Sequence, residues 1–468
     1  MQLIKKIFNK IEIKIILIFW IFLWLSVGVT PSNIDYKSLS LNNILNTTRL
    51  YTPIFLTIIF ITFITIKSIN INIFLEKKKN YFTFVNLFTI YFLVQIFGLY
   101  QNNLRQFEIE NFYLIILGFG AIVVFIAFDK IYKSTNNFKY LLYTSLIISS
   151  LATLFIFIFM LKNINFFEFI YISNIWDPNE IFLNNVLPRT TGISRSIALI
   201  NIALIIFFFN IKKNIYKLVI AFFIVNFSII IWGIQSRGSI LIFAIVAAVI
   251  IFLIKKITFK KKFIYLLTFL VLPIIIYQFI IFYTLTVKSY SFIPTTNDKV
   301  IYNKNNSSWN DYYNTNKAIF NNSRLVKDQS TSGRVNLWIT VFNKYDKNKI
   351  FGYGPQADRF LLQSLFETQG WGTNASNALV YSFASGGYIA LLIFIIINFK
   401  ILHNLYVCFF KKKIFENNQF TYIKLATAYI LFFWIRSVIE NSFAVFSIDF
   451  LLFSCSYLAI ENFLKRKH

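Results

Sequence analysis

Four arginines at the ends of apolar runs and a fifth in a long polar segment stand out in a chain whose other basic residues are mostly lysine. They are Arg189 and Arg195 around the start of one run, Arg237 at the start of another, Arg436 at the end of a third, and Arg334 after a Ser-Gly pair. A guanidinium is a planar fork of donors that fits phosphate oxygens bidentately. An arginine near membrane depth costs about 2.5–3.5 kcal/mol, so several of them indicate a shared anion such as pyrophosphate.

Two short motifs place helix starts beside these arginines. The segments TTGISRS and SRGS each lead into an apolar run, so backbone N–H groups at the helix N-termini would add donors to the same anion site. The alternative for any single arginine is that its side chain reaches the lipid headgroups from a helix end. That alternative weakens for the whole set, because lysine predominates elsewhere in the chain.

The composition predicts the elements that must position these residues. The 468-residue chain is 57% hydrophobic and 14% charged, against about 25% charged in soluble domains. Apolar runs long enough to cross a hydrocarbon core of about 30 Å recur along it. We therefore predict an all-α polytopic membrane protein with about twelve transmembrane helices in a single integral membrane domain, residues 1–468. The predicted spans are about 11–29, 50–67, 81–100, 110–128, 139–161, 192–210, 215–234, 238–254, 263–286, 378–399, 420–438 and 443–463.

The distribution of lysine predicts the orientation of these spans. Loops such as KKITFKKK and the tail KRKH would face the cytoplasm, and both termini would lie there. This distribution accounts for the net charge of +27, so no nucleic-acid partner is expected. The basic start and first apolar run lack a small-residue cleavage site, so we interpret them as the first span. The two cysteines, Cys408 and Cys455, indicate no disulfide framework.

One long segment, residues 287–377, is predicted to form a large loop on the side opposite the cytoplasm. Within it Trp338, Val341, Phe342 and Tyr345 recur at helical spacing, which predicts a short amphipathic helix at the membrane boundary. The following FGYGP would end that helix, because Gly-Tyr-Gly-Pro does not continue one. The loop would hold Arg334 over the anion site.

Some kinds of chemistry lack their usual residues in this sequence. There is no Asp-x-Asp for metal-held nucleotide sugars and no GxxxxGK[ST] phosphate loop, so we expect no metal and no cofactor. The two histidines, His403 and His468, both map to the cytoplasmic side. A general base on the other side would be a carboxylate, a tyrosine or the substrate itself. Glu440, four residues after Arg436, is the best-placed carboxylate, and an ion pair with Arg436 is the alternative reading.

Five segments in order give the chain a resemblance to a known family. RTTGISRSIALI, SRGSILIFAIVAAVI, TSGRVNLWITVF with IFGYGP, ASNALVYSFASGGYIALLIFI and RSVIENS are similar to motifs of the O-antigen ligase/polymerase family, over about residues 189–442. The resemblance implies a GT-C-like glycosyltransferase of the bacterial inner membrane, with a periplasmic active site. It also implies an undecaprenyl-pyrophosphate-linked oligosaccharide as substrate, no metal, membrane lipids as surroundings, and a chain-length regulator protein as a further candidate partner.

The resemblance also assigns roles to individual positions. Arg195 or Arg189 resembles the arginine of the family's R-x-x-G-T segment, Arg237 that of Ser-Arg-Gly, and Arg334 the one before tryptophan. We expect Arg195, Arg237, Arg334 and Glu440 to be catalytic. We expect the substrate to be bound by Arg189, Arg436, Ser376, Asn377, Gly352 and Gly354, the two glycines resembling the family's G-x-G turn.

The sequence departs from the family at one position, and this separates two activities. Ligases of the family usually carry His-Asn where this chain has Ser376-Asn377. We therefore predict an O-antigen polymerase that joins lipid-linked repeat units with inversion, and keep a ligase acting on lipid A core as the alternative. A lipid-linked-glycan flippase is less favoured, because internal repeats and charges at mid-span are not found. A purely structural membrane protein would not explain the long loop.

Overall fold

The computed structural model describes nine stretches of the chain. They are residues 84–102, 108–131, 190–233, 236–255, 257–288, 334–346, 349–362, 374–416 and 420–465, with isolated positions at 47–58 and 142–154. All the regular elements in these stretches are helices. Predicted span 11–29, most of 50–67 and of 139–161, and the loop residues 289–333 lie outside the described residues.

Five of the described helical segments are long and apolar enough to cross a membrane, so the protein is a polytopic membrane protein. They are α3 (Phe84–Gln101), α8 (Thr190–Asn210), α9 (Asn214–Gly233), the run from α11 (Phe259–Leu266) through η2 (Leu267–Val271) into α12 (Leu272–Lys288), and α17 (Ala378–Tyr406) with η3 (Val407–Lys411). The remaining long helices are α4 (Glu108–Ile131), α10 (Arg237–Leu253), α18 (Thr421–Arg436) and α19 (Ile448–Lys465). Where the predicted spans fall on described residues, nearly all coincide with a helix.

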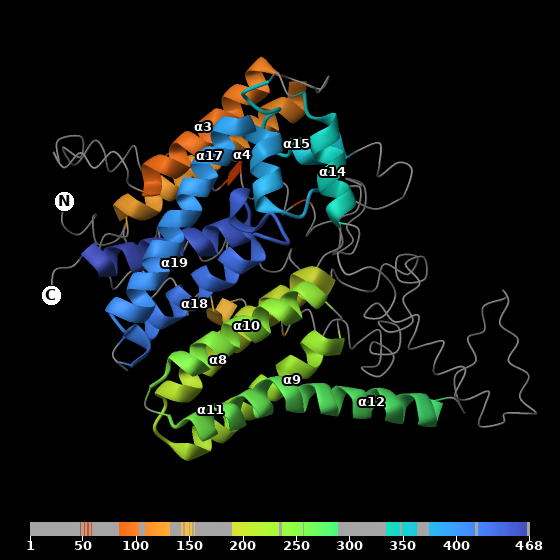
Figure 1. Ribbon diagram of the computed structural model, residues 1–468, viewed down its shortest axis with the longest axis vertical. Helices are drawn as coiled ribbons and strands as arrows, with labels where there is room; N and C mark the ends of the chain where they lie inside the picture. Colours follow the sequence, from red (N-terminus) through yellow and green to blue (C-terminus); the bar gives the residue numbers. More distant parts are fainter. Residues whose placement is uncertain are drawn as a thin grey trace, which may run out of the picture.

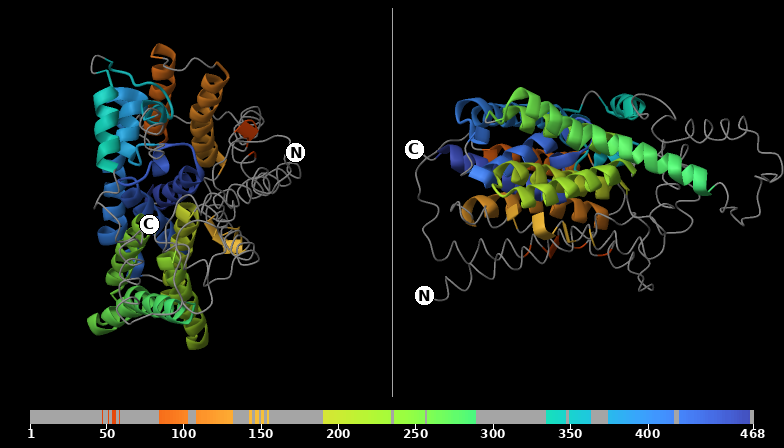
Figure 2. Two further views of the ribbon diagram at one scale, coloured as in Figure 1. Left: turned by 90° about the vertical axis from the view of Figure 1, so that its right-hand side faces the viewer. Right: turned by 90° about the horizontal axis from the view of Figure 1, so that it is seen from below.

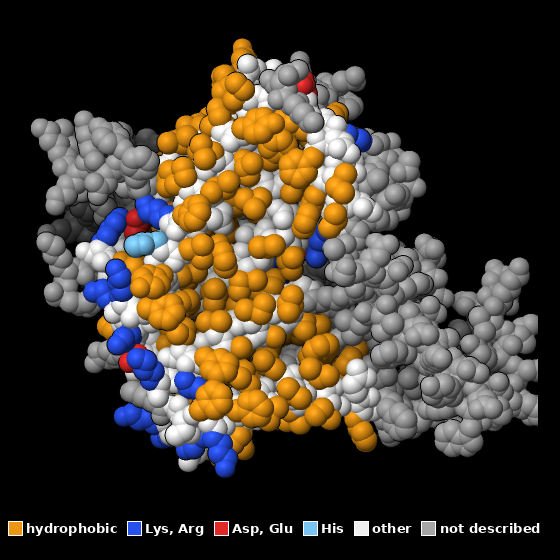
Figure 3. Space-filling view, viewed as in Figure 1, with side chains coloured by type: hydrophobic (Ala, Val, Ile, Leu, Met, Phe, Trp, Pro, Cys, Tyr) orange, Lys and Arg blue, Asp and Glu red, His pale blue; other side chains and the backbone are white. Residues whose placement is uncertain are grey.

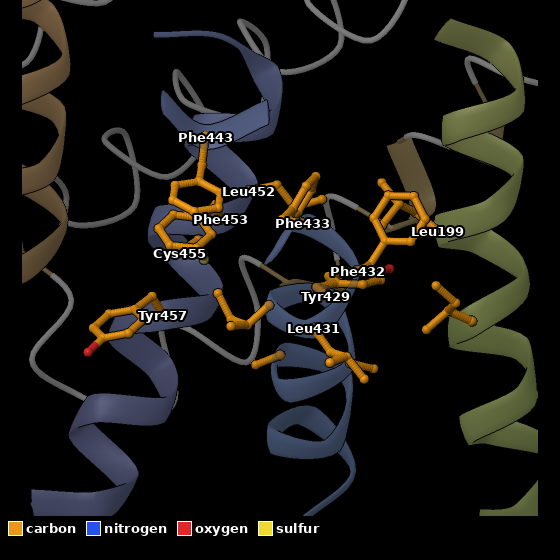
Figure 4. Packing of buried hydrophobic residues seen from close by; sticks show 14 of the residues in the cluster. Leu199, Tyr429, Leu431, Phe432, Phe433, Phe443, Leu452, Phe453, Cys455 and Tyr457 are labelled. Atoms are coloured by element: carbon orange, nitrogen blue, oxygen red, sulfur yellow. The ribbon is translucent and has the colours of Figure 1, made fainter. Parts of the chain in front are cut away.

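Helices α18 and α19 form the centre of the bundle. On one side α17 packs against α3, and α3 against α4; on the other side α8 and α10 pack against α18, with α9 and α12 beyond them. The central position follows from composition, because side chains from Phe450 to Ile460 on α19 are all buried. Figure 4 shows the aromatic part of this core, where Phe443 stacks on Phe453 at a centroid distance of 4.1 Å.

The predicted span 378–399 is not one regular helix, because α17 breaks near its start. Gly387 has φ 67° and ψ −159° inside the helix. Carbonyls freed by the break are bonded from another segment: Tyr353 N–H donates to Ala384 O (3.0 Å) and Gly354 N–H donates to Ser385 O (2.9 Å). In return Tyr388 N–H donates to Ile350 O at 3.1 Å. Residues 350–354, hereafter the brace, thus replace the missing turns of helix hydrogen bonding.

The predicted tight turn between the last two spans is also corrected by the structure. Helix α19 begins at Ile448 and not near residue 443, and the intervening chain contains the 3₁₀ helix η6 (Ser442–Ala444). Phe443 and Ala444 are fully buried, and Tyr91 Oη donates to Ala444 O at 3.3 Å. The linker therefore folds into the bundle, because its apolar side chains complete the core between α3 and α19.

The amphipathic helix predicted in the long loop is confirmed as α14 (Arg334–Lys344), followed by the short α15 (Ala357–Leu361). Leu337 and Val341 of α14 are buried in a small second core with Phe383 of α17. Trp338 Nε1 donates to Ala375 O at 2.8 Å, which fixes α14 to the residues before α17. The surrounding chain therefore holds Arg334, at the first position of α14, in a defined place.

The two ends of the bundle differ in charge. The arginine end is the end where α8, α10, α17 and α19 begin and α18 ends. The opposite lysine end carries surface lysines from residues 212–217, 255–262 and 411–413, and Figure 3 shows basic side chains gathered on the left of that view. The described lysines of the short loops therefore lie at the end opposite to the arginine cluster.

Candidate functional site

Asp449 joins two of the predicted arginines at the arginine end. Its Oδ2 atom lies 2.9 Å from Nη1 of Arg195 and 3.6 Å from Nε of Arg436. Asp449 is in the first turn of α19, Arg195 is in the second turn of α8, and Arg436 ends α18. All three side chains are largely buried, with exposed fractions of 5%, 14% and 8%. Three helices, of which α8 is far from α18 and α19 in sequence, thus meet at one carboxylate oxygen.

A second, looser ion pair adds the arginine of the long segment. Nη2 of Arg334 lies 3.7 Å from Oε1 of Glu440, and both side chains are 28% exposed. Glu440 is also close enough to Arg195 for their charges to interact. The two pairs therefore form one charged cluster, with Asp449 at its buried side and Arg334 at its exposed side.

The start of α10 reaches the same cluster. Ser239 accepts hydrogen bonds from Ser194 of α8 at 3.0 Å and from Ser236 at 3.2 Å. A Cβ atom built on Gly238 would meet the side chain of Ile439, the residue before Glu440, at 2.6 Å. The backbone at Arg237 therefore adjoins the cluster. The Arg237 side chain and the whole of Arg189 lie outside the described residues.

The helix termini make the arginine end electrostatically favourable for an anion. Helices α8, α10 and α14 all begin here, none has an acidic residue in its first turn, and each has an arginine at or near its start. A positive charge at a helix N-terminus is unfavourable, because the helix dipole is positive there. The described cluster holds three guanidiniums and two carboxylates, so its charge is positive before the helix termini are added. A phosphate or pyrophosphate would offset this charge and receive bidentate hydrogen bonds.

Two predicted substrate-binding residues use their polar atoms within the protein. Oδ1 of Asn377 accepts from the N–H groups of Leu379 and Val380, which caps α17, and its Nδ2 donates to Val438 O at 2.9 Å. The hydroxyl of Ser376 donates to Asn374 Oδ1 at 2.7 Å. Asn377 therefore ties α17 to the turn that carries Glu440, and the geometry favours a structural role.

The two predicted substrate-binding glycines belong to the brace. A Cβ on Gly352 would lie 2.4 Å from the Ser385 carbonyl carbon, and Gly354 has φ 93°. Gly98 of α3 is equally close to the brace, since its Cβ would meet Gly352 O at 2.6 Å. Glycine is required here for close backbone approach and for a left-handed conformation. Close packing within the fold and the positive φ of Gly354 thus account for the G-x-G pattern.

Two buried carboxylates are absent from the residues predicted from sequence. Asp449 could have been recognised from the sequence, because an acid inside a predicted apolar span indicates a functional or paired group. Asp358 of α15 has no such signal in a polar segment. It is completely buried, and its Oδ2 accepts from Ala375 N–H (2.8 Å) and Asn441 Nδ2 (3.3 Å). Asp358 thus connects the segment after the brace to the residue next to Glu440.

No group of three His, Cys, Asp or Glu side chains that could hold a metal ion is found among the described residues. The described groups nearest the cluster are guanidiniums, carboxylates, amides and hydroxyls. The candidate site can therefore bind an anion through arginine and accept a proton at a carboxylate.

The helical bundle defines a polytopic membrane protein, and a charged cluster with three arginines lies at one end of it. Residues 221–395 match the model of one protein family, which is described as O-antigen ligase. The chain therefore contains a domain of the O-antigen ligase family, which confirms the resemblance seen in the motifs. The match covers less than half of the chain, and it includes Arg237 and Arg334 but ends before Glu440 and Asp449. No curated protein and no solved structure matches the chain.

Proposed function

We propose that this protein is a membrane glycosyltransferase that polymerises lipid-linked oligosaccharide repeat units at the periplasmic face of the bacterial inner membrane. Members of the matching family transfer glycans from a lipid carrier, which agrees with an anion site at the end of a membrane bundle. The observation that carries the proposal is the set of arginines at acid-free helix N-termini around Arg195, Arg436 and Arg334. Such a site fits the pyrophosphate of an undecaprenyl-linked donor.

In this mechanism the arginines act on the leaving group. A hydroxyl of the acceptor glycan attacks the anomeric carbon of the donor, and the bond from that carbon to the pyrophosphate oxygen breaks. Undecaprenyl pyrophosphate leaves, and Arg195, Arg334 and Arg436 offset the charge that develops on it. Attack opposite to the leaving group inverts the anomeric centre. Arg237 and Arg189 are proposed to extend this site.

Glu440 is the proposed acceptor of the hydroxyl proton. It is partly exposed, it belongs to the cluster, and it sits at a long 3.7 Å from Arg334, so a phosphate that binds Arg334 would leave its carboxylate available. Ser376 does not serve as a base near neutral pH, and its hydroxyl already donates to Asn374. Among the described groups of the cluster, the Glu440 carboxylate is therefore the one we propose to take the proton.

The choice of polymerase over ligase rests on the acceptor side. The chain has Ser376 where the family's ligases carry a histidine, and both of its histidines belong to segments proposed to be cytoplasmic. A gene deletion distinguishes the two activities. Loss of a polymerase leaves single repeat units on the lipid A core, whereas a bare core with long glycans on the lipid carrier would establish the ligase.

The direct test is incubation of the purified protein with an undecaprenyl-pyrophosphate-linked oligosaccharide. We expect a ladder of longer lipid-linked glycans. We also expect the ladder to form in the presence of a chelator, because arginines supply the positive charge that metals supply elsewhere. Loss of the ladder in chelator, with recovery on adding magnesium or manganese, would contradict this mechanism.

A further inference from the structure

The carboxylate of Asp449 occupies a different environment from that of Glu440. Asp449 is 5% exposed and makes a 2.9 Å contact to Arg195, whereas Glu440 is 28% exposed and lies 3.7 Å from Arg334. Removing a partner from a buried ion pair is costly, because the remaining charge is left without compensation. A substrate anion can therefore displace Glu440 more easily than Asp449.

One oxygen of Asp449 fixes two guanidiniums. Oδ2 contacts Nη1 of Arg195 and Nε of Arg436, which come from different helices. The Nε atoms of both arginines are buried and lack a hydrogen-bond partner among the described residues. In that part of the chain, Asp449 is the acid that both side chains contact, so it limits how far either fork can rotate.

The place of Asp449 in α19 suits this role. A carboxylate in the first turn of a helix is stabilised by the helix dipole, so Asp449 is held where its charge is favourable. The adjoining residues of α19 are buried in the bundle core, which fixes the backbone beneath it. The carboxylate is therefore part of the rigid centre and does not depend on the segment that carries Arg334.

We propose that Asp449 is a positioning residue that sets the orientation of Arg195 and Arg436 before the lipid-linked pyrophosphate binds. This inference rests on the proposed function for its kinetic consequence. Asp449 does not contact the reacting atoms. It lowers the repulsion between two buried guanidiniums and holds both of them beside one carboxylate oxygen, in the cluster that Arg334 completes.

The kinetic test compares Asp449→Asn, Asp449→Glu and the wild-type protein in glycan elongation. For Asp449→Asn we expect kcat to fall about 100-fold, the loss that follows a misplacement of about 1 Å. KM for the lipid-linked donor should stay the same or fall, because the arginines keep their charge and lose a competing anion. Asp449→Glu should be intermediate, since it keeps the charge and moves it by one methylene group.

A matched control is Glu416→Gln, which removes an acid from the surface pair with Lys255 at the lysine end. It should keep the wild-type kcat and KM. An unchanged kcat in Asp449→Asn, or a loss confined to KM, would overturn the positioning role. If Asp449→Asn does not fold, Asp449→Glu decides: a wild-type kcat in that variant contradicts the proposal.

A second measurement does not depend on glycosyl transfer. Phenylglyoxal modifies accessible arginines, and peptide mass spectrometry reports the rate at each site. Modification of Arg195 and Arg436 should be faster in Asp449→Glu and Asp449→Asn than in the wild type, while the exposed Arg359 reacts at one rate in all three. Equal rates at Arg195 and Arg436 would refute the positioning role, even if the wild-type protein proved inactive in glycan elongation.

Discussion

The arginines at the arginine end differ in how firmly each is held. Arg195 and Arg436 share a buried carboxylate oxygen, whereas Arg334 faces Glu440 across a longer gap at the surface. Lysine carries the same charge but is a point charge without a planar fork. Arginine at these positions can therefore grip phosphate oxygens bidentately, which a lysine of the same charge cannot do.

Replacement of the arginines by lysine tests this point. Arg195→Lys, Arg334→Lys and Arg436→Lys should each lower kcat/KM by at least about tenfold, because one lost charge-assisted contact corresponds to about 1.5–3 kcal/mol. Arg359→Lys is the control, since Arg359 is exposed and outside the cluster. Glycan elongation rates measure the effect. Wild-type rates in all three cluster variants would show that a positive charge suffices.

The buried Asp358 predicts a pH dependence of stability. Burial raises the pKa of its carboxyl, and the hydrogen bonds from Ala375 N–H and Asn441 oppose this rise only in part. Because the native pKa is above the unfolded value of about 3.9, the native state holds the proton more tightly and stability falls as pH rises. Asp358→Asn removes this pH-dependent loss of stability.

We therefore expect the difference in Tm between Asp358→Asn and the wild type to become more favourable to the variant between pH 4 and pH 7.5, because the loss begins at the unfolded pKa of about 3.9. Thermal unfolding of the purified protein in detergent measures it at both values. A difference that stays constant, or moves in the opposite direction, would mean that Asp358 is fully compensated by its partners.

Helix α17 is the element whose geometry depends most on other segments. Its break at Gly387 exposes backbone groups that the brace satisfies, and Asn377 caps its first turn. In a bilayer such groups have no water to bond with, so an internal partner is required. The brace thus supplies hydrogen bonds that α17 needs, although residues 350–354 belong to another segment.

A substitution at Gly387 tests the break in α17. A Cβ on Gly387 would lie 2.0 Å from Ile350 O in a backbone with φ 67°, so Gly387→Ala should destabilise the protein by about 1–3 kcal/mol or more. The control is Gly118→Ala in α4, where the nearest atom is a movable Ile96 side-chain carbon at 2.9 Å. A lower Tm for Gly387→Ala alone is expected. Equal values would mean that the break relaxes without cost.

Some of these helices could be predicted from the sequence, whereas two of their irregular features could not. Hydrophobic runs predict helices wherever composition decides, so α3, α8 and α9 coincide with predicted spans. The break in α17 was not predicted, because a Gly-Gly pair in an apolar run is compatible with a continuous helix. The buried linker before α19 was missed for a related reason: Phe443 looks like the start of a span. Both features depend on contacts with α3 and the brace.

The candidate site follows a similar division. Arg195, Arg436 and Glu440 were selected from their positions at span ends and Arg334 from the long loop, and the structure gathers them. Asn377, Gly352 and Gly354 were selected from motif resemblance, and their contacts lie within the fold. Asp449 was missed because its closest partner is distant in sequence: Arg195 lies on α8. Pattern alone finds a charge at a helix end, but only packing shows which helix ends meet.

Among the described residues, the arginines of the cluster lie at one end of the bundle and the lysines of the short loops at the other. Positive residues favour the cytoplasmic side of membrane proteins, and the lysine end carries them in short loops. We therefore expect the lysine end inside and the long segment 287–377 outside. Both native cysteines are buried, which suits labelling with an impermeant thiol reagent.

Cysteines placed at Ser307 and Thr258 test this orientation in intact cells. Ser307→Cys should react with the reagent from outside, whereas Thr258→Cys should react only after the membrane is opened. The wild-type chain provides the background, and labelling in opened membranes controls for reactivity. Thr258→Cys reacting from outside would reverse the orientation and place the arginine cluster in the cytoplasm.

The brace also bears on how the chain enters the membrane during synthesis. Helix α3 leaves the ribosome first, the brace follows, and α17 comes after both. The hydrogen-bonding partners of the broken part of α17 are therefore synthesised before α17 itself. Unpaired backbone groups cost several kcal/mol each in hydrocarbon, and this order limits the time during which α17 would carry them. A chain rearranged so that α17 emerged before residues 350–354 would have to insert a broken helix without its partner. The order of the segments along the gene is therefore itself suited to assembly of the fold.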